Sequence, residues 1–284
     1  MSKAVWVGFP YPDKAYLHAG ARLAKNWERL HRGDREPLPD REGLEALIAA
    51  NPGLAQKGFD GAKAASALQE AWRLYHCGEF GKAVQAGLAL GVPGYTVANK
   101  ATAIYANSLE TDEARRLDLF QQVAQRCEEQ RAAAPRWANA HYLYAYALGR
   151  YSQRISVAKA LAQGLGGKIR DALTRTLELE PEHADAHIAL GTWHAEVVEK
   201  VGAMVAGLTY GAKKEAALEH HRRAIELNPE SAIARIEYAD SLVRLFGKAR
   251  MKEAETLYAE AARCTPADAM ERLDVEAARA ELEA

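Results

Sequence analysis

Small and large residues alternate at helical spacing along much of the chain, in stretches that end at a proline. The pattern is clearest where a small, a large and a small residue precede a proline: Ala254, Tyr258 and Ala261 before Pro266, and Ala217, His221 and Ala224 before Pro229. These three positions share one helical face, where the alanines admit a neighbouring backbone and the larger residue fills the gap. Proline then ends the helix, because it lacks the N–H that a helix interior needs.

Two further prolines close degenerate copies of the pattern: Ile169, Leu173 and Thr176 before Pro181, and Val123, Cys127 and Gln130 before Pro135. The helix after a proline carries a large residue followed at once by a small one, as in Leu190-Gly191, Tyr238-Ala239 and Tyr144-Ala145. Such a pair lets two helices cross closely. Strand signals are missing, which excludes most nucleotide-binding and hydrolase folds because they need a sheet. We predict an all-α solenoid of antiparallel helix pairs.

These units resemble the tetratricopeptide repeat (TPR) family. Its helix-turn-helix unit of about 34 residues has a large-small pair in the first helix, alanine-aromatic-alanine in the second, and a closing proline. The segment WRLYHCGEFGKAVQAGLAL, with Gly78-Glu79-Phe80 and Ala83, is similar to a further copy. The resemblance implies TPR-like repeats over residues 64–266, preceded by an N-terminal helical segment over 1–63 and followed by a C-terminal capping helix over 267–284.

Two units are longer than the family's unit, and we assign the extra residues to the inserts SQRISVAKALAQGLG and VEKVGAMVAGLTYGAK. Each insert is expected to continue the preceding helix, with apolar residues at Ile155, Ala158 and Leu161 or at Val198, Val201 and Val205, and to end in glycines at 164, 166 and 167 or at 207 and 211. Insertions in repeat proteins often project on the binding face. The two lengthened hairpins either form an apolar ridge or pack only on each other.

Inserts of this kind are also similar to those of TPR proteins of the transporter-associated periplasmic type and of regulators of microtubule dynamics. The periplasmic proteins need an export signal, whereas the N-terminus MSKAVWVGFPYPDKAY lacks the apolar length of one. Before the repeats, we predict an amphipathic helix over Asp13 to Arg32, a break at REPLPD, and a second helix from Arg41 to Ala50 with Asp40 as its N-cap.

Composition narrows the class of protein further. Hydrophobic residues make up 49% of the 284 residues, which is ample for a core, and the net charge of −1 gives no bulk attraction to nucleic acid or acidic lipid. Cys77, Cys127 and Cys264 are odd in number and far apart, which argues against a disulfide framework and a zinc site. No stretch has the length of a membrane span. We expect a cytoplasmic protein without a membrane span.

Two patterns invite a chemical interpretation. His183, His187 and His194 share one helical stripe near Glu196, but the third histidine lies two turns beyond the second, so we favour packing histidines over a metal site. The sequence GLGGK lacks the GxxxxGK[ST] spacing of a phosphate loop. No serine, cysteine and carboxylate set has an interpretable spacing. We predict no catalytic site, no metal and no cofactor.

In the TPR family the first helices of successive units line a concave groove. When the repeats are aligned with the family's unit, the resemblance places twelve residues in this groove: Asn139, Tyr142, Tyr146, Arg150, Asp185, Ile188, Thr192, Glu196, Ile233, Ile236, Asp240 and Arg244. Chaperone-binding members grip a peptide carboxylate with lysines and asparagines, which tyrosine and isoleucine replace here. We predict a noncatalytic scaffold or binding module that holds a protein segment or an apolar small ligand. The alternative is a self-assembling structural protein that uses the inserts as an oligomer interface, and an unrecognised enzyme ranks third.

Overall fold

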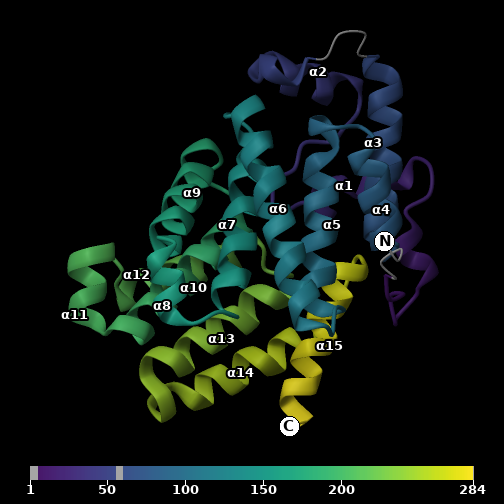
Figure 1. Cartoon of the computed structure of the whole chain (residues 1–284). Coiled ribbons are helices and arrows are strands. Elements are labelled where there is room, and N and C mark those ends of the chain that lie inside the picture. Colours follow the sequence, from purple (N-terminus) through teal and green to yellow (C-terminus); the bar gives the residue numbers. More distant parts are fainter. Residues whose placement is uncertain (1–5, 56–59, 284) are drawn as a thin grey trace. The chain divides into compact units, whose positions relative to one another are not determined.

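The computed structural model describes residues 6–55 and 60–283, which form helices and no strand (Figure 1). The all-α prediction is therefore confirmed. The chain divides into two compact units. The first unit comprises residues up to 30, 36–154 and 268–270, and the second comprises 31–35, 155–267 and the residues from 271 onward. The division into segments 1–63, 64–266 and 267–284 stays a prediction.

The helices of the first unit, apart from the first, pack against their neighbours in the chain. They are α1 (Arg22–Leu30), α2 (Arg41–Ala50), α3 (Gly61–His76), α4 (Phe80–Leu88), α5 (Tyr95–Ser108), α6 (Glu113–Ala133) and α7 (Ala138–Ser152), with 3-10 turns at Lys14–Leu17, Pro52–Leu54 and Val92–Gly94. Helix α4 packs between α3 and α5, and α6 packs between α5 and α7. The core includes the fully buried rings of Trp72, Tyr75, Phe80, Tyr105 and Phe120. The stacked helices thus bury large aromatic side chains between them.

The N-terminal predictions are confirmed in part. Helix α2 has the predicted bounds, and the Asp40 carboxylate caps it by accepting the backbone N–H of Gly43 at 2.8 Å. The single helix expected over Asp13 to Arg32 is wrong, because a 3-10 turn and α1 occupy that stretch. His18 and Gly20 have φ angles of +40° and +57°. This left-handed backbone interrupts a right-handed helix.

The helices of the second unit are α8 (Val157–Ala162), α9 (Leu165–Leu179), α10 (Ala184–Val201), α11 (Ala203–Val205), α12 (Lys214–Leu227), α13 (Ala232–Phe246), α14 (Met251–Ala261) and α15 (Ala269–Glu283), with a π turn at Ala206–Tyr210 and a 3-10 turn at Gly247–Arg250. Helix α10 packs against α9, α12 and α13, and α13 packs against α14. In α15, Val275 and Ala278 pack with Ala232 and Ala261, so the helix covers the last pair.

The predicted close crossing of helices is present between α10 and α12. A Cβ atom built on Gly191 would lie 2.8 Å from Nε2 of the buried His221. The His221 ring stacks on Tyr238 with a centroid distance of 5.3 Å, and its Nε2 lies 2.8 Å from Oγ of Ser241. The buried Ala217 and Ala224 flank His221 along α12, as the small-large-small pattern requires.

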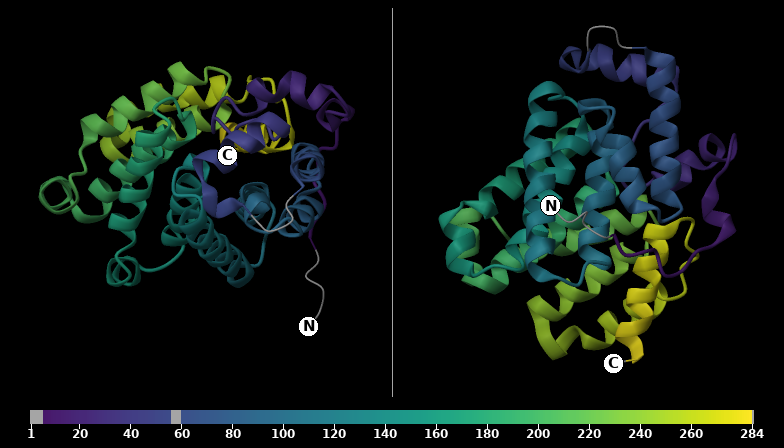
Figure 2. Two further views of the ribbon diagram at one scale, coloured as in Figure 1. Left: turned by 90° about the horizontal axis from the view of Figure 1, so that it is seen from above. Right: turned by 45° about the vertical axis from the view of Figure 1, so that its right-hand side comes forward.

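The first insert does not follow the preceding helix as predicted. Helix α7 ends at Ser152, and Ser156 caps the separate helix α8, so the first insert does not continue α7. A serine N-cap favours a new helix start over continuation. The second insert does continue α10, which runs to Val201. In both figures the green segment that carries α11 projects beyond its neighbours in the second unit (Figures 1 and 2).

The glycines of the inserts have different roles. Gly164 and Gly211 have φ angles of +64° and +72° and make the turns. Gly166 and Gly167 lie inside α9, so their prediction as turn residues is wrong. Large apolar side chains are exposed on both inserts: Val157, Leu161, Met204, Val205 and Leu208. The second insert reaches the start of α9, where Arg170 donates to the backbone oxygen of Tyr210 at 3.3 Å.

Candidate functional site

The twelve predicted groove positions fall into two sets. Asn139, Tyr142, Tyr146 and Arg150 lie on α7 of the first unit. The other eight lie in the second unit, on α10 for Asp185, Ile188, Thr192 and Glu196, and on α13 for Ile233, Ile236, Asp240 and Arg244.

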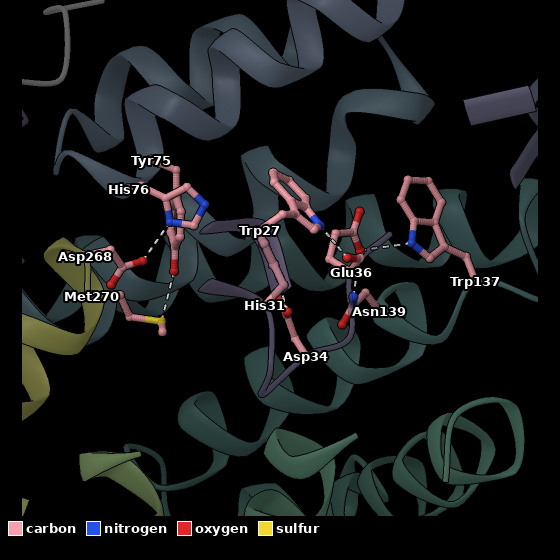
Figure 3. Close-up of polar contacts among 10 residues, drawn as sticks. All are labelled: Trp27, His31, Asp34, Glu36, Tyr75, His76, Trp137, Asn139, Asp268 and Met270. Atoms are coloured by element: carbon pink, nitrogen blue, oxygen red, sulfur yellow. Dashed lines mark hydrogen bonds and ion pairs between the residues drawn. The ribbon is translucent and has the colours of Figure 1, made fainter. Parts of the chain in front are cut away.

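At the start of α7, Asn139 holds a carboxylate from the N-terminal part of the chain. Its amide nitrogen donates to Oε2 of Glu36 at 2.6 Å, and the indole N–H of Trp137 donates to the same oxygen at 3.2 Å (Figure 3). The indole N–H of Trp27 donates to the backbone oxygen of Glu36 at 2.7 Å. All four side chains are buried. Because a buried carboxylate needs partners, this contact fixes Glu36 at the positive end of α7.

Further along α7, Tyr142, Tyr146 and Arg150 lie on successive turns. The ring centroids of the two tyrosines are 6.2 Å apart, and the Arg150 guanidinium lies 5.3 Å from the centre of the Tyr146 ring. Tyr142 is buried, whereas Tyr146 and Arg150 are half-buried. A cation over a tyrosine face is a stabilising arrangement, and an N–H of the Arg150 guanidinium also donates to the side-chain oxygen of Gln153 at 3.3 Å. This face of α7 therefore combines an aromatic surface with a positive charge.

At the start of α10, Asp185 also contacts the N-terminal part of the chain. Its backbone N–H donates to the carbonyl oxygen of Gly33 at 3.0 Å. A Cβ atom on Gly33 would lie 2.3 Å from an Asp185 carboxylate oxygen, so the Asp185 side chain would have to move to admit a larger residue there. Arg32 pairs with Glu230 at 2.8 Å within the same unit. In the second unit, residues 31–35 thus lie against the starts of α10 and α13.

The isoleucines of the predicted set belong to the core of the second unit. Ile188 is buried with Ala224 and Ala234, and the partly buried Ile233 packs against the same cluster. Ile236 packs against the cluster that includes Val275 of α15. These three side chains stabilise helix packing, since each buried methylene contributes about 0.8 kcal/mol.

The polar residues of the predicted set in the second unit have partners within that unit. The Thr192 hydroxyl donates to Glu237 at 3.0 Å, and Glu196 pairs with Lys200 at 3.4 Å. Arg244 pairs with Glu199 at 2.8 Å. Asp240 accepts a hydrogen bond from the Tyr258 hydroxyl, and burial raises the pKa of its carboxyl above the usual range.

The histidine stripe has structural partners. The Nδ1 of His183 accepts the backbone N–H of Ala186 at 3.0 Å and caps α10. Nε2 of His187 donates to the Pro181 carbonyl at 3.2 Å, so its Nδ1 accepts from His220 at 2.8 Å. His194 stacks on His220 and accepts the backbone N–H of Lys213.

The same histidine-to-proline contact occurs in another repeat, where Nε2 of His141 lies 3.0 Å from the Pro135 carbonyl. Its recurrence at an equivalent position argues for a structural role. In the part of the chain that the structure describes, no group of three or more histidine, cysteine or carboxylate residues is placed to hold a metal ion.

Neither Cys77 nor Cys127 has the properties of a nucleophile. Burial raises the pKa of the Cys127 thiol to about 12, and burial also raises the pKa of Cys77 above its ordinary value. The thiolate is the reactive form, so both side chains remain thiols at neutral pH.

Three residues that make these contacts, Glu36, Trp137 and Gly33, were not predicted from the sequence. Trp137 precedes α7 and carries an indole N–H that needs a partner when buried, which was the one signal in the sequence. Its partner, 101 positions away in the chain, was not accessible to spacing arguments.

Two comparisons bear on the family and the fold. A model of the family described as regulator of microtubule dynamics protein 1-3 matches residues 95–283, more than half of the chain. The chain belongs to this family. The crystal structure of a thermophilic TPR protein of Thermus thermophilus is similar, with a TM-score of 0.54 and 15% identity over 76% of this chain and 98% of that one. This likeness shows the fold.

The predicted resemblance to TPR proteins and to regulators of microtubule dynamics is therefore confirmed. A search of curated proteins found no match. No helix among the described residues is long and apolar enough to cross a membrane.

Proposed function

We propose that the protein is a noncatalytic scaffold that holds an extended segment of a partner protein against its first helices. Its family and its TPR fold support a protein-interaction scaffold. The observation that carries the proposal is the face of α7, where the two tyrosines and Arg150 follow one another on successive turns. Tyrosine and arginine are the residue types that most often dominate protein recognition.

Tyr146 and Arg150 are the side chains to which we assign partner contact, because both are half-buried whereas Tyr142 is buried. The Tyr146 ring offers an apolar surface and the Arg150 guanidinium offers a positive charge, and together they would orient a peptide.

One cavity of the first unit is too small to hold an apolar small ligand. This cavity, lined by residues that include Pro37, Leu44, Trp72 and Trp137, has a volume of about 10 Å³. This is the space of one water molecule. Sites for small molecules usually measure about 300 Å³ or more.

The test is capture of a partner from cell lysate by the wild type and by Tyr146→Ala/Arg150→Ala. The double variant should bind the captured protein at least about 30-fold more weakly, since loss of a dominant anchor costs about 2 kcal/mol or more. Tyr95→Ala is the matched control, because Tyr95 is a half-buried tyrosine of the same unit on α5, bonded to Glu129. Circular dichroism checks that all variants are folded. Equal capture by the folded double variant would refute the assignment.

Self-assembly through the inserts is the second candidate. Met204 is 75% exposed and Leu208 is 84% exposed, and large exposed apolar side chains are typical of interaction surfaces. Light scattering at micromolar concentration shows whether the protein forms an oligomer. If it is strictly monomeric, self-assembly is excluded. If an oligomer forms, Met204→Lys/Leu208→Lys should dissociate it without unfolding the chain.

A further inference from the structure

The segment His31–Pro39, which joins α1 to α2, contacts the same repeat position in each unit. Asn139 and Asp185 are each the second residue of a first helix, α7 and α10. In the first unit Asn139 binds Glu36, and in the second unit Asp185 binds Gly33. Both helix positions belong to the predicted groove. The segment thus makes, in both units, contacts of the kind that the proposed function gives to a partner segment.

The contact with Glu36 has the chemistry of a carboxylate site. We define the carboxylate socket as Trp137 and Asn139, whose N–H groups both donate to Oε2 of Glu36. Both residues lie at the start of α7, where the helix dipole favours a negative charge. Hydrogen bonds to an ionised acceptor are roughly twice as strong as neutral ones. The socket therefore prefers a carboxylate to a neutral side chain.

The backbone around Glu36 has the form of an extended bound peptide. Pro37 follows Glu36 directly, and a following proline disfavours helical backbone in the preceding residue. The Trp27 indole holds the Glu36 carbonyl, so the segment is bound through both its main chain and its side chain. These are the two kinds of contact by which extended peptides are recognised.

The residue before Glu36 is strained. Arg35 has a φ angle of +51°, in the left-handed region that non-glycine residues rarely adopt. Its side chain is exposed. Its backbone N–H donates to the His31 carbonyl at 2.8 Å, and its guanidinium pairs with Glu182 at 3.6 Å. A non-glycine residue in the left-handed region costs free energy, which lowers the cost of opening the turn.

We propose that His31–Pro39 is a resident ligand, held through Glu36 at the start of α7 in the first unit and through Gly33 at the start of α10 in the second. The partner contributes an extended acidic segment whose glutamate replaces Glu36 in the carboxylate socket. This inference rests on the proposed function, because it names the chemistry of the partner segment and the part of the chain that competes with it. The partner's glutamate has extended backbone, like that of Glu36 in front of Pro37.

Opening of the segment is measured by limited trypsin cleavage after Arg35 in the full chain. Glu36→Gln should raise the cleavage rate about tenfold or more, relative to cleavage of a free peptide with the same residues 31–39. The charge-assisted bonds to the socket are then lost while the helices stay folded. Cleavage should also depend only weakly on urea, as expected for local opening. If Glu36→Gln and the milder Glu36→Asp both unfold the protein, or if cleavage follows global unfolding, the segment is structural and the proposal is wrong.

Replacement of the segment is measured with a fluorescent peptide of residues 31–39. The peptide should bind the full-chain Glu36→Gln variant at least about tenfold more tightly than the wild type, whose tethered segment competes at an effective concentration in the millimolar range. Asn139→Ala in the same variant should abolish this gain, and the peptide with Glu36→Gln should bind weakly to every chain. Equal affinity for all three chains, or no binding to any, overturns the proposal.

These outcomes are separate from the test of the proposed function. Loss of capture in Tyr146→Ala/Arg150→Ala supports partner binding on α7, whatever occupies the carboxylate socket. Peptide exchange at Glu36 can fail while that capture persists, in which case only the resident-ligand inference is wrong.

Discussion

Replacement of Gly191 by alanine tests the close crossing of α10 and α12. The new Cβ atom would lie 2.8 Å from Nε2 of His221 and 2.9 and 3.0 Å from two ring carbons, so the ring must move. His221 is fully buried, and its ring is fixed by Tyr238 on one side and by Ser241 at 2.8 Å. A displaced ring loses the hydrogen bond to Ser241 or clashes elsewhere in the core.

The change in the free energy of unfolding caused by Gly191→Ala is the sum of two opposing effects. Overpacking of a core costs about 1 to 3 kcal/mol. Alanine in place of glycine in a helix gains up to about 1 kcal/mol. We therefore expect Gly191→Ala to lower the free energy of unfolding by about 1 to 2 kcal/mol. Gly167→Ala is the matched control, because Gly167 lies in α9 of the same unit and a Cβ atom added there would meet no atom of a neighbouring element within 4 Å.

Urea unfolding monitored by far-ultraviolet circular dichroism measures both variants. Gly191→Ala should unfold at a lower urea concentration with an unchanged slope, whereas Gly167→Ala should be as stable as the wild type or slightly more stable. If Gly191→Ala is as stable as Gly167→Ala, the helices do not cross as closely as described, and the large-small pair has another explanation.

Two further predictions concern the histidines. Burial lowers the pKa of His221 to about 4. The unfolded chain, with a histidine pKa of about 6.5, therefore binds the proton first as pH falls, and between about pH 6.5 and 4 the free energy of unfolding should decrease by up to about 3 kcal/mol. Urea titrations across this range should show a smaller decrease for His221→Gln, and an identical decrease would contradict the assignment. His187→Ala should destabilise the protein by removing its bonds to Pro181 and His220, while added zinc should leave the melting temperature unchanged. A stoichiometric metal in untagged protein, found by elemental analysis, would overturn this structural interpretation.

The sequence predicted what depends on local spacing. The small-large-small pattern identified the buried face of α12. Its two alanines and His221 are spaced three and four residues apart, so they lie on one side of the helix, and all three are buried. Asp40 could be assigned as a cap because its interaction spans three residues. The break near His18 was missed, because a left-handed histidine leaves no pattern in composition.

The carboxylate socket could not be predicted for a different reason. Glu36 and Asn139 are 103 positions apart, and a contact at that separation depends on how the chain folds back. The phase of the repeat assigns Asn139 to the face of α7 that lines the groove in the family, and this assignment stays a prediction. It carried no information on whether a segment of the same chain lies there.

The central claim, that a partner segment binds along α7, is tested most directly by site-specific photo-crosslinking. A benzophenone amino acid at Tyr146 is compared with the same group at Gln125, an exposed position on α6 of the same unit. We predict that a partner protein crosslinks from position 146 and not from 125, and that Glu36→Gln increases the yield from 146. Equal crosslinking from both positions, or none from 146 while the partner is bound, would contradict the claim.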